Sequence, residues 1–241
     1  MNTRDQQNAE PSRDHVWRMF DRIAHRYDLL NQLLSLGRDA AWRKQFARNL
    51  PQDAGLRVLD LATGTADVLI TLAKDPRVIS GIGLDMSWEM LRHGHQKLAR
   101  LELHPQFSLL RGDATCQPLA SASFDLVTIA FGIRNVTDVT ACLKEMLRIL
   151  KPGGRALILE FSLPKNLLFR ALYLAYFRHV LPRIGGFISG DASAYRYLNA
   201  TVETFPYGDA FLHLMIEAGF AHTTAHPLTF GIATLYQGHK E

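Results

Sequence analysis

The chain has 241 residues, of which 47% are hydrophobic and 21% are charged, and its formal net charge is +4. This balance is typical of a globular protein with one sizeable core, and it excludes a chain too polar to pack. The mild basic excess is compatible with nucleic acid, with an anionic membrane surface or with neither, because lysine and arginine form no dense cluster. We expect a single domain over residues 1–241.

The cysteines and the N-terminus indicate the compartment. Cys116 and Cys142 lack the spacing of a zinc site, so we expect reduced thiols in the cytoplasm and no metal. The first residues contain no apolar signal core. The most apolar stretch, residues 167–181, is interrupted by Arg170 and Arg178, whereas a spanning helix needs ~20 mostly apolar residues. The chain is therefore expected to span no membrane, although it can lie on one.

Helical periodicity begins near Asp14. Apolar residues spaced three and four apart share one helical face, namely Val16, Phe20, Ile23 and Tyr27. Further helical segments are predicted over residues 29–36 and 39–50, with Gly37 as the break between them. A cluster of short helices is thus expected to lead into the main part of the domain.

Apolar strands then alternate with amphipathic helices. Strands are predicted over 56–61, 78–84, 107–110, 124–130 and 155–160, and helices over 66–74, 87–101, 136–150 and 209–218. Ser87 is the expected N-cap of its helix, and residues 151–154 are expected to form a turn. Two extended segments, 222–230 and 232–237, close the chain as an antiparallel pair. The alternation predicts an α/β fold with a mostly parallel sheet, whose ligands bind at the carboxyl ends of the central strands.

The first strand opens into a loop of small residues, Asp60–Asp67, with Gly64 near its centre. Such a loop lets the backbone approach a ligand and directs helix N–H groups at it. It lacks the GxGxxG pattern of dinucleotide folds. It resembles the glycine loop of class I methyltransferases, with Ala62 and Ala66 replacing two glycines. Ordinary turn chemistry is the alternative for this loop taken alone.

Two acidic strand ends suit a nucleoside. Asp85 ends the second strand ~20 residues after the loop, where a carboxylate meets ribose hydroxyls. Asp113 follows the third strand and is placed to accept a hydrogen bond from an adenine amino group, while Ala114 offers its backbone N–H. The alternative for Asp85 is a solvated residue that caps the next helix.

The fourth strand ends in Ala130-Phe131-Gly132-Ile133-Arg134-Asn135. This position faces the reacting methyl group in class I methyltransferases, and the Asn-Pro-Pro-Tyr string of many amino-methylating enzymes is absent. Arg134 and Asn135 instead indicate a guanidinium and an amide over a substrate oxygen. An arginine paired with a structural carboxylate is the alternative.

Nearly the whole chain, from about Val16 to Lys240, resembles the ubiquinone/menaquinone biosynthesis C-methyltransferases, including the demethylmenaquinone methyltransferases. The matching strings are MFDRIA at 19–24, VLDLA at 58–62, FGIRNV at 131–136, LKPGG at 150–154, EFS at 160–162, VLPRIG at 180–185 and YRYL at 195–198. FGIRN and YRYL are the most selective of these strings.

The resemblance implies a class I, Rossmann-like methyltransferase with a mostly parallel seven-stranded sheet and helices on both faces. It implies S-adenosyl-L-methionine as cofactor. The residues that fall on the family's cofactor contacts are Gly64, Thr65, Asp85, Asp113, Ala114 and Ala130. Ala130 stands where the family often has serine, so a hydroxyl contact is lost there. No metal is implied.

The implied substrate is a prenylated quinol, with demethylmenaquinol converted to menaquinol and a ubiquinone-pathway benzoquinol as the alternative. Arg134 and Asn135 are expected to be catalytic, because they would bind the quinol oxygen and stabilise a developing phenolate. Arginine is a poor base, so a water, His179 or Tyr195 remains as the proton acceptor. Surface histidine is the plainer interpretation of His179.

Two segments are expected to complete the site. Residues 14–50 would form an N-terminal helical lid, and 163–207 a substrate-side insertion for the prenyl tail. The apolar residues near 167–177 fit a tail channel or a peripheral membrane surface as well as they fit a core or a homodimer interface. No nucleic-acid partner is expected, since the insertion resembles no RNA module. Three rivals stay open: methylation of RNA or another small molecule, cofactor binding without catalysis, and a nicotinamide oxidoreductase.

Overall fold

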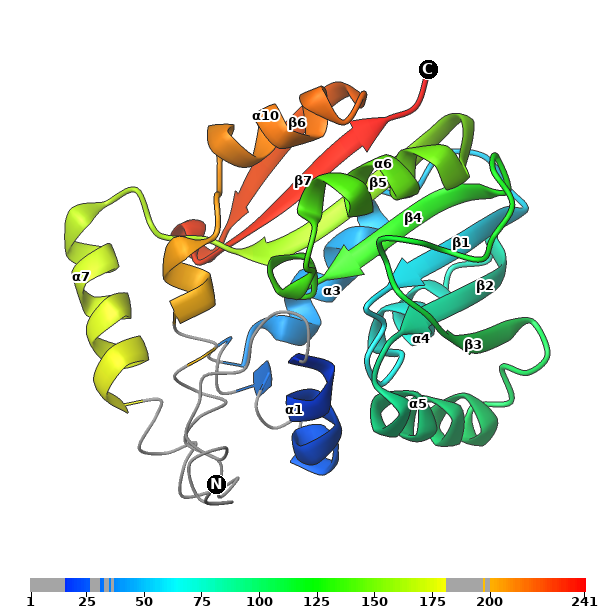
Figure 1. Ribbon diagram of the computed structural model, residues 1–241, viewed down its shortest axis with the longest axis horizontal. Helices are drawn as coiled ribbons and strands as arrows, with labels where there is room; N and C mark the ends of the chain where they lie inside the picture. Colours follow the sequence, from blue (N-terminus) through cyan, green and yellow to red (C-terminus); the bar gives the residue numbers. More distant parts are fainter. Residues whose placement is uncertain (1–15, 27–30, 33–34, 36, 181–196, 198–199) are drawn as a thin grey trace, which may run out of the picture.

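The computed structural model describes residues 16–26, 31–32, 35, 37–180, 197 and 200–241 (Figure 1). Its strands are β1 Leu56–Leu61, β2 Val78–Asp85, β3 Phe107–Arg111, β4 Phe124–Ala130, β5 Leu150–Phe161, β6 Ala221–Leu228 and β7 Ala233–His239. They form one seven-stranded sheet in the order β3-β2-β1-β4-β5-β7-β6. Strands β1 to β5 are parallel, and β7 runs antiparallel to both of its neighbours. The predicted mostly parallel sheet is confirmed.

Helices cover both faces of the sheet (Figure 1). The α-helices are α1 Val16–Ile23, α3 Asp39–Arg48, α4 Asp67–Leu72, α5 Trp88–Arg100, α6 Val139–Ile149, α7 Leu167–Ala175 and α10 Asp209–Glu217. Shorter helical turns are η3 Ala24–Arg26, η4 Ile133–Asn135, the π-helical η5 Tyr176–Val180 and η6 Thr229–Gly231.

Side-chain alternation along the strands builds two cores. In β1, Val58 packs in the cluster that contains α1, α3, α4 and α7 residues, whereas the next residue, Leu59, packs in the cluster with α6 and α10. Leu126 and Val127 of β4 divide in the same way. Successive residues of a strand point to opposite faces, so a strand covered on both sides must be apolar throughout. That is why the central strands are mostly apolar, as in Val58–Leu59 of β1 and Leu126–Val127 of β4.

The element boundaries differ from the predicted ones where caps and bulges intervene. Ser87 is the N-cap of α5, as predicted, and its hydroxyl accepts from the Met90 amide at 3.2 Å. Helix α6 begins at Val139 because Asp138 caps it, accepting from the Ala141 amide at 2.9 Å. The expectation of a plain turn at residues 151–154 was wrong, since β5 begins at Leu150 and continues through these residues past a register shift.

The N-terminal and inserted segments are described in part. Tyr27 and Tyr195 lie outside the described residues, as do 181–196 of the predicted insertion. Within the described part of the chain, no helix is both long enough and apolar enough to cross a bilayer. Cys116 is exposed and Cys142 is buried, and both are free thiols.

Candidate functional site

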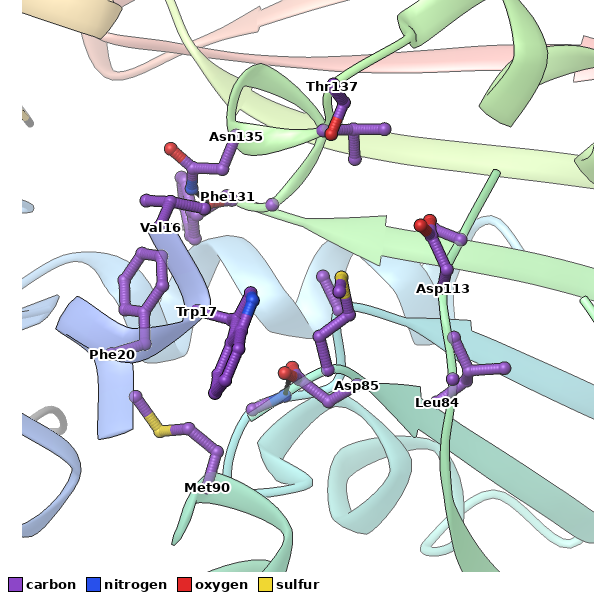
Figure 2. A pocket seen from close by; sticks show the side chains of 17 residues that line it. Val16, Trp17, Phe20, Leu84, Asp85, Met90, Asp113, Phe131, Asn135 and Thr137 are labelled. Carbon is purple, nitrogen blue, oxygen red and sulfur yellow. Dashed lines mark hydrogen bonds between the residues drawn. The ribbon is translucent and has the colours of Figure 1, made fainter. Parts of the chain in front are cut away.

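A cavity opens at the carboxyl ends of β1, β2, β3 and β4, where the sequence places the ligand. It encloses about 710 Å³ including its open mouth. Figure 2 shows Asp85 and Asp113 on its walls, with Trp17 and Phe20 opposite them. The lining residues include Gly64, Asp85, Asp113, Ala114 and Asn135 among those singled out from the sequence. Five of the eight predicted site residues therefore come together here.

Asp85 is held in place by the backbone around it. Its Oδ2 accepts from the Gly64 amide at 2.8 Å, and its Oδ1 accepts from the Ser87 amide at 2.8 Å. Burial raises the pKa of Asp85, while these backbone hydrogen bonds oppose the rise. Each carboxylate oxygen can accept more than one hydrogen bond, so both remain able to bind ribose hydroxyls.

The loop of small residues after β1 contains two alanines in a backbone conformation that is usual for glycine. Ala62 and Ala66 have φ values of 46° and 67°, in the left-handed region that favours glycine. A Cβ on Gly132 would lie 2.5 Å from the Ala62 Cβ, so the first and fourth strand loops pack closely. The Ala66 methyl is fully buried and does not line the cavity.

Asp113 and Ala114 lie after β3 on the adjoining wall. Both the amide and the hydroxyl of Thr115 donate to Asp113 Oδ1 at 2.8 Å. These bonds orient the carboxylate through Oδ1, and Oδ2 can still accept from a ligand. This pair is suited to an adenine, which presents an amino donor beside a ring nitrogen acceptor.

Helix α1 closes one side of the cavity. Val16, Trp17 and Phe20 contribute apolar walls. Asp21 on the same helix accepts from the Ser87 hydroxyl at 2.5 Å and from the Glu89 amide at 3.1 Å, at the N-terminus of α5. A carboxylate at a helix N-terminus satisfies otherwise unpaired amides and the helix dipole. Helix α1 is thus joined to the N-terminus of α5 through Asp21.

Thr65 and Ala130 line a second, smaller cavity of about 340 Å³. It also contacts Arg43, Asp60 and Asp67. Ala62 and Phe131 line both cavities, so the two spaces adjoin at these residues. The predicted cofactor contacts are consequently divided between two connected spaces.

Arg134 is buried beside Glu160 rather than on the wall of either cavity. Its Nη1 lies 2.7 Å from Glu160 Oε1 and also donates to the Phe131 carbonyl at 2.6 Å. Burial raises the pKa of Glu160, and the Arg134 charge opposes that rise. Among the described residues, neither Arg134 Nε nor Asn135 Oδ1 has a hydrogen-bond partner. Such buried unpaired atoms are costly unless a ligand satisfies them.

Several site residues were missed from the sequence. Glu160 follows the apolar run Ala156–Leu159 of β5, and a charge directly after that run was the available signal. Trp17 and Asp21 were overlooked, because they lie between the apolar positions that define the buried face of α1.

His179 is exposed and lines neither cavity. Over the described residues, no cluster of three or more metal-ligating side chains occurs.

Comparison with known proteins identifies the family. The model of the ubiE/COQ5 methyltransferase family matches residues 6–240. The chain belongs to this family.

The relatives of this methyltransferase are similar over almost their full length. The ubiquinone/menaquinone biosynthesis C-methyltransferase UbiE of Syntrophotalea carbinolica is 49% identical over 91% of this chain and 92% of its own. The demethylmenaquinone methyltransferase of Deinococcus radiodurans is 45% identical over 93% and 92% of the two chains. That of Thermus thermophilus is 42% identical over 92% and 100%. The chain is an S-adenosylmethionine-dependent C-methyltransferase of quinone biosynthesis.

Solved structures share its fold. A SAM-dependent methyltransferase from Thermotoga maritima superposes with a TM-score of 0.68 at 20% identity, covering 94% of this chain and 100% of that one. Phosphoethanolamine N-methyltransferase 2 of Haemonchus contortus, solved with S-adenosyl-L-methionine, gives a TM-score of 0.60 at 16% identity over 84% and 52% of the chains. The fold is that of class I methyltransferases.

The donor set fits S-adenosylmethionine. The larger cavity combines two oriented carboxylates with apolar side chains from α1 and β4, which suits a ribose and a flat base. The loop between β1 and α4 brings backbone close to the ligand because its alanines hold left-handed conformations.

Proposed function

We propose that this methyltransferase converts demethylmenaquinol to menaquinol by methylating a ring carbon. The names of its relatives from Deinococcus radiodurans and Thermus thermophilus support this substrate. A second candidate, a benzoquinol of ubiquinone synthesis, is supported by the relative from Syntrophotalea carbinolica, whose name carries both quinones. The acceptor is the reduced quinol, because an oxidised quinone ring is too electron-poor to attack a methyl group.

We infer that the adenosine of the donor lies in the larger cavity. Asp85 would accept from the ribose hydroxyls, and Asp113 from the adenine amino group, with the Ala114 amide donating to the ring. The orientation of both carboxylates by backbone or side-chain donors supports these roles, since a preorganised acceptor loses little entropy on binding. When bound, S-adenosylmethionine supplies an electrophilic methyl group on a sulfonium.

Arg134 and Asn135 are proposed to hold the quinol oxygen next to the ring carbon that is methylated. The observation that supports this role is their pair of buried, unpartnered polar atoms, Nε and Oδ1. Nε would donate to the oxygen as it becomes a phenolate, and Oδ1 would orient a hydroxyl. Glu160 is a positioning residue, because its ion pair at 2.7 Å fixes the guanidinium. The hydroxyl proton leaves to water, since arginine does not accept it. After methyl transfer the ring carbon loses its own hydrogen as a proton and the oxygen regains one, which restores the aromatic quinol.

The assay uses the purified enzyme with methyl-labelled donor and a short-chain demethylmenaquinol kept reduced, compared with a benzoquinol and with total RNA. Label is expected in the naphthoquinol product. Arg134→Lys is expected to lower turnover by about 10²–10³-fold, the effect of losing one donor to a developing oxyanion, with donor affinity unchanged. This variant keeps a cation beside Glu160. Label that enters RNA alone would contradict the proposal.

The prenyl tail of such a substrate resides in a membrane, and the surface of α7 supports peripheral contact with one. Five exposed apolar side chains, hereafter the α7 patch, are Leu167, Leu168, Phe169, Leu172 and Phe230. Phe169 and Phe230 stack with ring centroids 5.0 Å apart, which joins α7 to η6. Residues 162–190 contain four lysines or arginines and no acidic residue. Apolar side chains flanked by cations are typical of membrane-surface helices.

A further inference from the structure

The two adjoining cavities differ in charge. Among the residues that the structure describes, the larger cavity is lined by two acidic side chains, Asp85 and Asp113, and by no lysine or arginine. The smaller cavity is lined by one cation, Arg43, in addition to Asp60 and Asp67. A ligand carboxylate would face only other carboxylates in the larger space, whereas in the smaller one it can pair with Arg43.

Arg43 belongs to α3, and its side chain lines the smaller cavity next to Asp67, the first residue of α4. Its side chain is 13% exposed. The Nη2 atom lies 2.7 Å from Asp39 Oδ2 and 3.4 Å from Asp67 Oδ2. Both contacts use the same nitrogen, so other N–H groups of the guanidinium, which lines the cavity, remain as donors.

The neighbouring charges are already balanced before any ligand binds. Asp67 has a second cation, Lys97, whose Nζ lies 2.7 Å away and also donates to the Thr65 hydroxyl at 2.8 Å. Arg43 and Lys97 thus face Asp39 and Asp67, two charges against two. Asp60 also lines this cavity, and because burial raises its pKa to about 7, it adds less than a full negative charge at neutral pH. An amino acid group, which carries one charge of each sign, can enter without upsetting this balance.

We propose that Arg43 is the charge partner of the donor's amino-acid carboxylate. This rests on the proposed function, in which adenosine fills the larger cavity. The amino-acid end must then extend past Ala62 and Phe131, which line both spaces, into the cavity where Thr65 and Arg43 lie. There Arg43 donates to the carboxylate, and helix α3 thereby contributes to donor binding from outside the sheet.

The test compares two nucleosides that share adenosine and differ in the amino-acid end. S-adenosylhomocysteine carries the carboxylate, and 5′-methylthioadenosine lacks it. For Arg43→Gln we expect binding of S-adenosylhomocysteine to weaken about 10–100-fold, and binding of 5′-methylthioadenosine to change by less than about threefold. Arg43→Lys should recover most of the loss because it restores the charge. Lys44→Gln removes an exposed cation from the same helix and should alter neither affinity.

The double variant Asp39→Asn/Arg43→Gln removes both charges of the buried pair and is measured in parallel, since a lone buried carboxylate destabilises the fold. It should show the same selective loss. Equal weakening of both nucleosides by Arg43→Gln and by the double variant, or unchanged binding of S-adenosylhomocysteine, would overturn the role of Arg43. Failure of 5′-methylthioadenosine to bind the unaltered enzyme would instead overturn the placement of adenosine.

Discussion

Asp85 illustrates how a single side chain is prepared for its ligand. Two backbone amides, from Gly64 and Ser87, hold its carboxylate at the end of β2 before any ligand arrives. Burial raises its pKa, which shows that the charge is kept at some cost. Residues whose pKa is shifted by burial in this way are concentrated at functional sites.

Asp85→Ala is expected to weaken binding of S-adenosylhomocysteine about 10–100-fold, from the loss of hydrogen bonds worth ~1.5–3 kcal/mol each to a charged group. Calorimetry measures the affinity. Asp125→Ala is the matched control, because Asp125 pairs with Lys151 at 2.7 Å and lines neither cavity. Equal losses in the two variants would remove Asp85 from the binding site.

Asp60 makes the stability of the protein depend on pH. Burial raises its pKa from 3.8 to about 7, although the hydroxyls of Thr63 and Thr128 donate to it at 2.6 Å. Between these pH values the folded chain binds more protons than the unfolded chain. The contribution of Asp60 to the free energy of unfolding therefore falls as the pH rises from about 4 to about 7, by up to ~1.4 kcal/mol per pH unit.

Asp60→Asn should reduce this pH dependence, because an amide does not titrate. Urea unfolding of both proteins at pH 5 and pH 7.5 provides the comparison. Asp85 and Glu160 also have raised pKa values, so the difference between the two proteins is the informative quantity. If the two pH dependences coincide, Asp60 does not titrate in this range.

At the scale of elements, the short helix α1 is held in place by apolar packing and by the hydrogen bonds of Asp21. Helix α1 has eight residues, and isolated helices of that length are unstable in water. Its buried residues Val16, Met19 and Ile23 pack in the core, while Asp21 binds the N-terminus of α5 through Ser87 and Glu89. The wall that α1 provides for the larger cavity thus depends on Asp21.

Asp21→Ala should loosen α1 and expose the cavity. We expect amide exchange in Val16–Ile23 to accelerate by about 10-fold, in line with ~1–2 kcal/mol for a helix-capping carboxylate. Exchange of α6, which packs on the other face of the sheet, is the internal reference. S-adenosylhomocysteine should also bind more weakly. Unchanged exchange in α1 would show that apolar packing alone holds it.

At the scale of the whole molecule, the larger cavity and the α7 patch are two separate features of the surface. Four strand ends and α1 enclose the larger cavity. Helix α7 lies beyond the carboxyl end of β5 (Figure 1), and several of its apolar side chains are exposed. Leu167 is 80% exposed, and Phe230, far away in the sequence, is 75% exposed. Exposed apolar patches of this kind mark interaction surfaces.

Leu168→Glu/Leu172→Glu should weaken binding to vesicles that contain phosphatidylglycerol at least 10-fold. Two apolar side chains that would enter the bilayer surface are replaced by negative charges, which the anionic lipid repels. Cosedimentation measures this binding. Ile216→Glu, at a 54% exposed position on α10, controls for an added charge. Methylation of a water-soluble, short-chain quinol should be unaffected. A variant that still binds vesicles but no longer dimerises would assign the patch to a homodimer.

The sequence by itself determined the order of strands and helices, the parallel sheet and the positions of Asp85 and Asp113. Periodicity reports which face of an element is buried, and spacing along a βα unit places a residue at a strand end. The tertiary structure alone decided which charges meet. Arg134 is paired with Glu160, and Arg43 lies beside Asp67, because separate elements pack together there. Such contacts depend on how helices dock on the sheet, and no local pattern in the chain encodes that docking.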